Sequence, residues 1–121
     1  MLVDGRFDPT QYTELEIEYA FEAFVGEVRE LVAHHYKTQF PNLPPEEITV
    51  NEGRTYWKLV KAREGGQAAS VYGFVRKADG AILKAANWRA PNVKGPSAIR
   101  GYVMQDNAIK AATPYGIIYA R

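Results

Sequence analysis

The hydrophobic period of the chain changes once, and three prolines mark the change. Apolar residues recur at steps of three and four before the stretch QFPNLPPEE and at steps of two after it. Steps of three and four place side chains on one face of a helix, whereas steps of two place them on one face of a strand. Pro41, Pro44 and Pro45 cannot continue a helix, because proline lacks a backbone N–H. The sequence therefore predicts a helix joined to a sheet by a semi-rigid connection.

The predicted helix begins near Glu14 and ends near Lys37 or Thr38. Thr13 and Glu16 form a capping box, in which the hydroxyl accepts from an amide of the first turn and the carboxylate reaches back. The apolar stripe comprises Ile17, Phe21, Phe24, Val28, Leu31 and His35, widened by Ala20, Val25 and Val32. Five glutamates lie mostly off this stripe: Glu16, Glu18, Glu22, Glu27 and Glu30. The helix is therefore amphipathic, with an acidic outer face.

Five short segments after the prolines are rich in β-branched and aromatic residues, as strands are. They span residues 48–53, 55–62, 69–77, 80–87 and 115–121. The pairs Gly65-Gly66 and Asp79-Gly80 are typical of hairpin turns, since both residue types tolerate positive φ. The weakly periodic residues 89–114 are expected to form a long loop with one helical turn near 107–111. The predicted fold class is α+β, with one long N-terminal helix packed on an antiparallel β-sheet of four to five strands.

The formal net charge of +1 conceals opposite charges in the two halves of the chain. The 121 residues are expected to form a single domain, 1–121, with an acidic helical part (1–45) and a basic, β-rich part (46–121). Residues 1–53 carry eleven acidic side chains against three basic ones, and residues 54–121 carry twelve basic against three acidic. The basic half favours an anionic partner. The alternative is that the two halves pair with each other inside the fold.

Several classes of chemistry lack the residues that they need. The chain has no cysteine, which excludes disulfides, thiolate catalysis and cysteine-zinc sites. His34 and His35 are the only histidines and, as neighbours on a helix, face different sides, so they cannot chelate one metal ion. Neither Ser70 nor Ser97 lies in a nucleophile elbow. We therefore expect a protein that is not an enzyme and that holds no metal ion or cofactor. We also expect a cytoplasmic location, since no signal peptide or apolar run of ~20 residues is recognisable.

Aromatic and basic residues alternate along two of the predicted strands. In SVYGFVRK, Tyr72, Phe74 and Arg76 should share one face, which is the layout of an RNA-recognition strand that stacks bases and meets a phosphate. The same Tyr-Gly-Phe run also suits a strand whose rings pack in the core under a helix. In YWKLVKA, Tyr56 and Lys58 should likewise share a face.

The segment NWRAPNVKGPSAIRG combines an indole ring with several cations, and no acid occurs between Ala81 and Gln105. Trp88 offers a stacking face, and the basic side chains around it can neutralise phosphates. The alternative is a mobile loop pinned by a buried Trp88. The predicted nucleic-acid-binding residues are Tyr72, Phe74, Arg76, Lys84, Trp88, Arg89, Lys94 and Arg100.

The stretch from Tyr56 to Arg121 resembles a group of small uncharacterised proteins encoded by bacteriophages. The shared pattern is V-Y-x-F-V-x-K-x-x-G-x-I-L-K-A-A-x-W-x-A-P, which residues 71–91 match, followed by a basic loop with Gly101 and a tail with Tyr115, Gly116, Tyr119 and Arg121. The resemblance implies a small accessory protein in the cytoplasm of an infected bacterium. Such proteins bind nucleic acid, inhibit a host protein or capture a nucleotide signal.

The sequence favours the first of these functions. We expect a non-catalytic nucleic-acid-binding accessory protein, with single-stranded or structured nucleic acid as its partner and no membrane partner. One alternative is an interaction module whose acidic helix docks on a host protein or mimics the charge of DNA. Another is a nucleotide sponge, in which the loop around Trp88 closes over a small phosphate-bearing ligand.

Overall fold

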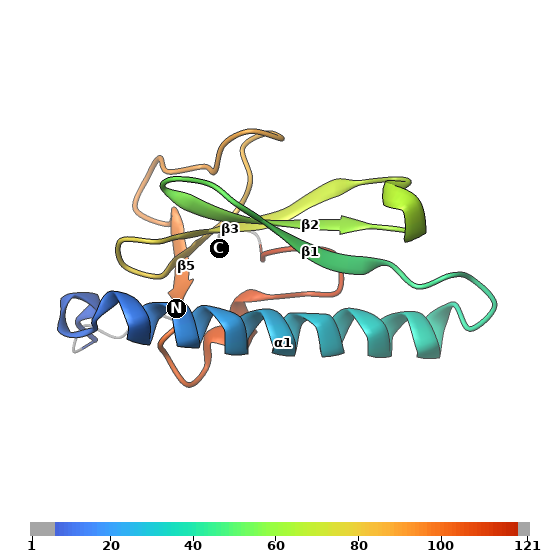
Figure 1. Ribbon diagram of the computed structural model, residues 1–121, viewed down its shortest axis with the longest axis horizontal. Helices are drawn as coiled ribbons and strands as arrows, with labels where there is room; N and C mark the ends of the chain where they lie inside the picture. Colours follow the sequence, from blue (N-terminus) through green and yellow to red (C-terminus); the bar gives the residue numbers. More distant parts are fainter. Residues whose placement is uncertain (1–6, 119–121) are drawn as a thin grey trace.

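One long helix lies along one face of an antiparallel sheet in the computed structural model, which describes residues 7–118 (Figure 1). The five strands follow chain order across the sheet, from β1 to β5. The elements are η1 (Pro9–Gln11), α1 (Glu14–Gln39), β1 (Glu47–Glu52), β2 (Tyr56–Ala62), η2 (Glu64–Gly66), β3 (Ser70–Arg76), β4 (Ala81–Leu83), β5 (Ile99–Tyr102) and η3 (Ala108–Ala111). The predicted α+β class, with a long N-terminal helix and an antiparallel sheet, is confirmed.

The helix begins at the predicted capping box. The Thr13 hydroxyl accepts a hydrogen bond from the Glu16 amide at 3.1 Å, and the Thr13 amide donates to the Glu16 carboxylate at 2.9 Å. The buried side of α1 comprises Ile17, Phe21, Phe24, Val25, Val28, Val32 and Tyr36. The helix ends at Gln39, just beyond the predicted end, and Pro41 follows its C-cap. No helix within residues 7–118 is long and apolar enough to cross a membrane.

Gly26 lies in α1 on the side that faces solvent. A Cβ atom added there would meet no other atom within 4 Å. Because glycine destabilises a helix interior, Gly26→Ala should raise the free energy of unfolding by about 0.5–1 kcal/mol in urea denaturation. Gly73→Ala in β3 is the opposing control, since its Cβ would overlap the Ile117 side chain and lower stability. An unchanged or reduced stability of Gly26→Ala would contradict the prediction.

Both predicted hairpin turns are present. Gly65 and Gly66 lie between β2 and β3 with φ of +78° and +79°. Gly80 lies between β3 and β4 with φ of +72°, beside Asp79, whose carboxylate accepts from the Ala81 amide at 3.1 Å. These φ values are ones that only glycine adopts readily, which is why the turns could be found from the sequence.

The last strand differs from the prediction. Residues 89–114 were expected to be a loop, yet they contain β5, which pairs with β4. The expected strand at 115–121 is represented within the described residues only by an isolated bridge between Ala112 and Ile117, and its Tyr119 and Arg121 lie outside the described residues. The strand IRGY is short and interrupted by Gly101, so it shows no clear period of two. The helical turn expected near 107–111 is confirmed as η3.

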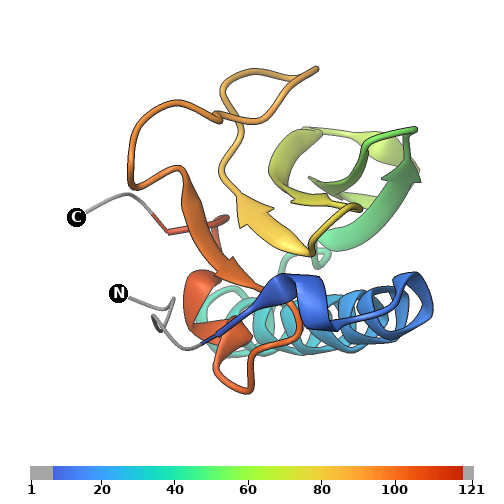
Figure 2. The ribbon, with the colours of Figure 1, turned by 90° about the vertical axis from the view of Figure 1, so that its left-hand side faces the viewer.

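The sheet is packed on both faces. The main core lies between α1 and the sheet, where the ring of Phe21 stacks on Trp57 with centroids 4.1 Å apart. A smaller cluster of Phe74, Leu83 and Ala98 lies on the other face. Figure 2 shows the segment 84–98, in orange, on the side of the sheet away from α1. The helix α1 therefore covers one face of the sheet, and the segment 84–98 covers part of the other.

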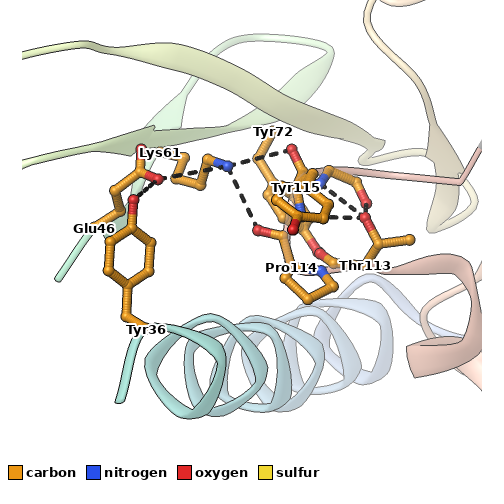
Figure 3. A network of polar contacts seen from close by, with 8 residues as sticks. Tyr36, Glu46, Lys61, Tyr72, Thr113, Pro114 and Tyr115 are labelled. Atoms are coloured by element: carbon orange, nitrogen blue, oxygen red, sulfur yellow. Dashed lines mark hydrogen bonds and ion pairs between the residues drawn. The ribbon is translucent and has the colours of Figure 1, made fainter. Parts of the chain in front are cut away.

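A polar network joins the end of α1 to the C-terminal segment (Figure 3). The buried Lys61 ammonium lies 3.7 Å from the Glu46 carboxylate and donates to the carbonyl oxygens of Pro114 and Tyr115 at 3.4 and 3.5 Å. The Tyr36 hydroxyl donates to the same carboxylate, and this bond, followed by burial, raises the pKa of Tyr36. The network therefore connects helix, sheet and C-terminal segment around one buried cation.

Candidate nucleic-acid groove

An open groove of about 380 Å³ lies on the side of the sheet away from α1. It is lined by Asn51, Glu52, Gly53, Arg54, Thr55, Tyr56, Lys58, Phe74 and Arg89. Three of these side chains are cations, and the one acid, Glu52, pairs with Lys77 at 2.6 Å. The rings of Tyr56 and Phe74 meet edge to face, with centroids 5.9 Å apart. The groove therefore combines an aromatic floor with a net positive lining.

The β1–β2 hairpin and the alternation along β2 supply one side of the groove. The Gly53 amide donates to the Tyr56 carbonyl at 2.9 Å and closes the turn that carries Arg54. Along β2, Trp57 and Leu59 belong to the core under α1, whereas Tyr56 packs on the cluster of the opposite face. The alternation predicted for this strand is therefore confirmed, and it places Lys58 on the groove side.

The other side of the groove is the tip of the loop 84–98. The Asn87 side chain accepts from the amides of Arg89 and Ala90 at 2.8 and 3.0 Å, and the Ala86 amide donates to the Ala90 carbonyl at 3.0 Å. A bridge between Ala85 and Pro91 closes this turn at its base. An asparagine that caps its own turn in this way fixes the backbone locally. The loop therefore presents Trp88 and Arg89 from a defined turn.

Trp88 borders the groove through its contact with Lys58. The Lys58 ammonium lies 4.2 Å from the centroid of the indole ring and donates to the Trp88 carbonyl at 3.0 Å. The Trp88 side chain nevertheless remains 48% exposed. The loop is thus held by a cation on one face of the ring, and the alternative of a loop pinned by a buried Trp88 is wrong.

The expected stacking platform on β3 is not formed. Tyr72 and Phe74 are only 2% and 3% exposed, and they lie in the clusters on opposite faces of the sheet. Leu59 pairs with Gly73 and Val60 with Val71, so Tyr72 is an extra residue at a β-bulge. The bulge shifts the alternation by one residue and turns Tyr72 toward α1. There its hydroxyl donates to the Thr113 carbonyl at 2.6 Å, and burial raises its pKa.

The predicted basic residues are divided among different places. Arg76 makes two hydrogen bonds to Asp79, at 3.0 and 2.9 Å, which raise its pKa, so its charge is neutralised locally. Lys84 donates to the carbonyl of Ile117, a residue of the core under α1. Burial, and then the charge of Arg100, lower the pKa of Lys84.

Arg100 and Lys94 also lie outside the groove lining. The Nε and Nη1 atoms of Arg100 are buried and have no hydrogen-bond partner among residues 7–118. Lys94 is exposed on the loop, where its amide donates to the Asn92 side chain at 3.1 Å. Of the eight predicted residues, Phe74 and Arg89 line the groove, and Trp88 borders it.

The groove residues that were not among the predicted site residues include two cations and a ring: Arg54, Lys58 and Tyr56. The alternation of Tyr56 with Lys58 along β2 was a usable signal for two of them. Arg54 lies in the turn before β2, and nothing in the sequence shows that the loop 84–98 folds back toward that turn. Within residues 7–118, no group of three His, Asp or Glu side chains could hold a metal ion.

The opposite charges of the two halves are paired only in part. Glu46 and Glu52 form ion pairs with Lys61 and Lys77 of the basic half. No ion pair within the described part of the chain involves a glutamate of α1. The alternative that the two halves neutralise each other therefore holds for Glu46 and Glu52 and not for the helix.

Comparison with known proteins gives one family. No curated protein and no solved structure matches the chain. A family model described as a family of unknown function, DUF7717, matches residues 8–111. The match covers α1, all five strands and every residue that lines the groove. The chain therefore belongs to the DUF7717 family, whose function is unknown.

Proposed function

We propose that this protein is a non-catalytic accessory protein that holds single-stranded nucleic acid in the groove between the β1–β2 turn and the loop 84–98. The observation that supports this function is the convergence of three cations, Arg54, Lys58 and Arg89, with aromatic rings around one groove. Cations release counterions from phosphates, and exposed rings stack on bases. A duplex hides the faces of its bases, so a single strand suits an exposed ring better than a duplex does.

The proposed function belongs to the cytoplasm of an infected bacterium. The resemblance of residues 71–91 to bacteriophage-encoded proteins supports a role in the cytoplasm of an infected bacterium, where single-stranded intermediates of replication and transcription are abundant. The charge of the groove also supports an anionic ligand. Glu52 is the one acid in its lining, and Lys77 neutralises it.

Binding should be salt-dependent and sensitive to Trp88. Short labelled single strands are expected to bind with micromolar Kd at low salt and to quench tryptophan fluorescence. If three cations contact phosphates, the slope of log K against log salt should be about −2 for a single strand. Trp88→Ala should weaken binding by about 1–3 kcal/mol, because a stacked base is lost. Fluorescence anisotropy at several salt concentrations measures both quantities.

The control is a cation outside the groove. Lys110→Gln removes an exposed charge from η3, whereas Arg89→Gln removes one from the groove lining. Arg89→Gln should reduce both the affinity and the salt slope, the slope by about 0.7, and Lys110→Gln should change neither. Equal effects of the two substitutions would mean that binding follows net charge and not the groove. The absence of binding at low salt would refute the proposed function, and preference for mononucleotides over oligonucleotides would favour the nucleotide sponge.

A further inference from the structure

The outer face of α1 carries apolar side chains that the fold leaves uncovered. Leu15 is 60% exposed and Tyr19 is 65% exposed. Leu15, Tyr19 and Glu22 follow at steps of four and three, so they lie on one face of the helix. That face points away from the sheet, because the buried stripe of α1 lies on the opposite side. These two large apolar side chains, together on an acidic surface, are available for contact with another protein.

The acids of this face form no ion pair with another described residue. The helix α1 has six glutamates and only two basic residues, Arg29 and Lys37. No ion pair among residues 7–118 involves any of these eight side chains. Glu16 serves the capping box, and Arg29 donates to the Ile48 carbonyl at 3.1 Å. The remaining glutamates therefore present a negative field to solvent.

The groove has the complementary properties. Its rim carries Arg54, Lys58 and Arg89, and its floor carries the rings of Tyr56 and Phe74. Amphipathic helices bind such grooves by inserting apolar side chains at steps of three and four while charges pair at the edges. The outer face of α1 offers Leu15 and Tyr19 for the floor and glutamates for the rim.

We propose that the outer face of α1 of one copy docks into the groove of a second copy of this chain. The groove of the same chain is out of reach, because α1 lies on one side of the sheet and the loop 84–98, which supplies Arg89 to the groove, lies on the other (Figures 1 and 2). Since the two surfaces differ, the contact is heterologous, and the pair as a whole retains one free helix face on one copy and one free groove on the other. The proposal does not require nucleic-acid binding, although both ligands would compete for the groove.

Paired charge reversals test this arrangement by sedimentation velocity at low salt. The wild-type chain should form assemblies that grow with concentration and dissociate as salt is added. Glu18→Arg combined with Glu22→Arg alters only the helix face, and Arg54→Glu combined with Arg89→Glu alters only the groove. Each double variant alone should associate at least about tenfold more weakly than the wild type, because like charges then meet.

Mixing the two double variants gives the decisive result. The groove variant retains an intact helix face, the helix variant retains an intact groove, and the two reversed surfaces are again opposite in charge, so an equimolar mixture should recover the association that each variant lacks alone. Lys94→Glu combined with Lys110→Glu is the matched control, since it makes the same charge change at exposed positions outside the groove. This control should associate as the wild type does.

Three results would overturn the proposal. They are a wild-type chain that stays monomeric at high concentration and low salt, a mixture of the two double variants that stays monomeric, and self-association that survives either double reversal. Oligonucleotide binding by a monomeric wild-type chain would refute the self-association and leave the proposed function intact. Self-association without oligonucleotide binding would support the docking of α1 in the groove and refute the proposed function.

Discussion

Phe21→Ala is expected to lower the free energy of unfolding by about 3–5 kcal/mol, as truncation of a buried phenylalanine does. Phe21 is buried in the core between α1 and the sheet, and its ring stacks on Trp57 with centroids 4.1 Å apart and planes 10° apart. The substitution removes the ring that joins the helix to β2 and leaves a cavity beside the indole. Urea denaturation followed by circular dichroism measures the loss.

The matched control is Tyr19→Ala on the exposed face of the same helix. It removes a ring of similar size, yet its effect on unfolding should stay within about 0.5 kcal/mol, because the ring is largely in solvent already. A loss of the same size for both substitutions would contradict the prediction, because the loss would then not depend on packing against Trp57. The loss expected for Phe21→Ala is a large part of the 5–15 kcal/mol by which an ordinary domain is stable. The variant should therefore be measured at low temperature, where it remains folded.

The second large effect is expected from Glu46→Gln. This substitution removes the charge that faces the Lys61 ammonium and retains an oxygen for the Tyr36 hydroxyl (Figure 3). The side chains of Lys61 and Glu46 are only 10% and 14% exposed, so the cation would remain desolvated beside carbonyl oxygens alone. We expect a loss of about 3 kcal/mol, the lower end of the range for breaking a buried ion pair.

A double-mutant cycle isolates the charge from the packing. Lys61→Met removes the cation and retains an apolar side chain of similar length. Combined with Glu46→Gln, it should recover at least about 1 kcal/mol relative to Glu46→Gln alone, because no buried charge is then uncompensated. Losses that simply add would show that the two side chains stabilise the fold independently. Urea denaturation of the four proteins at one pH completes the cycle.

The features that could be predicted from the sequence are local ones. The capping box at Thr13 and Glu16, the apolar stripe of α1 and the positive-φ glycines of two turns each depend on neighbours within a few residues. The alternation along β2 is equally local, and it correctly placed Tyr56 and Lys58 on one face. Local chemistry of this kind decides which elements form and where they begin.

The candidate site was predicted only in part for two physical reasons. The β-bulge at Tyr72 depends on how β3 aligns with β2, and one extra residue was enough to move that ring to the other face. Strand β5 pairs with β4 through backbone hydrogen bonds, although its own residues show weak strand character. In both cases pairing with another segment overrides the pattern in the segment itself.

The sequence by itself therefore determined the α+β class, the helix with its acidic face and the turn-forming glycines, because each follows from the spacing of nearby residues. Only the tertiary structure decided that Tyr72 is core, that Arg76 is neutralised by Asp79 and that Arg54, Lys58 and Arg89 line one groove. Those three cations are separated by up to 35 positions along the chain. The physical reason is that sheet register and the path of the loop 84–98 are set by long-range packing, which no local period encodes.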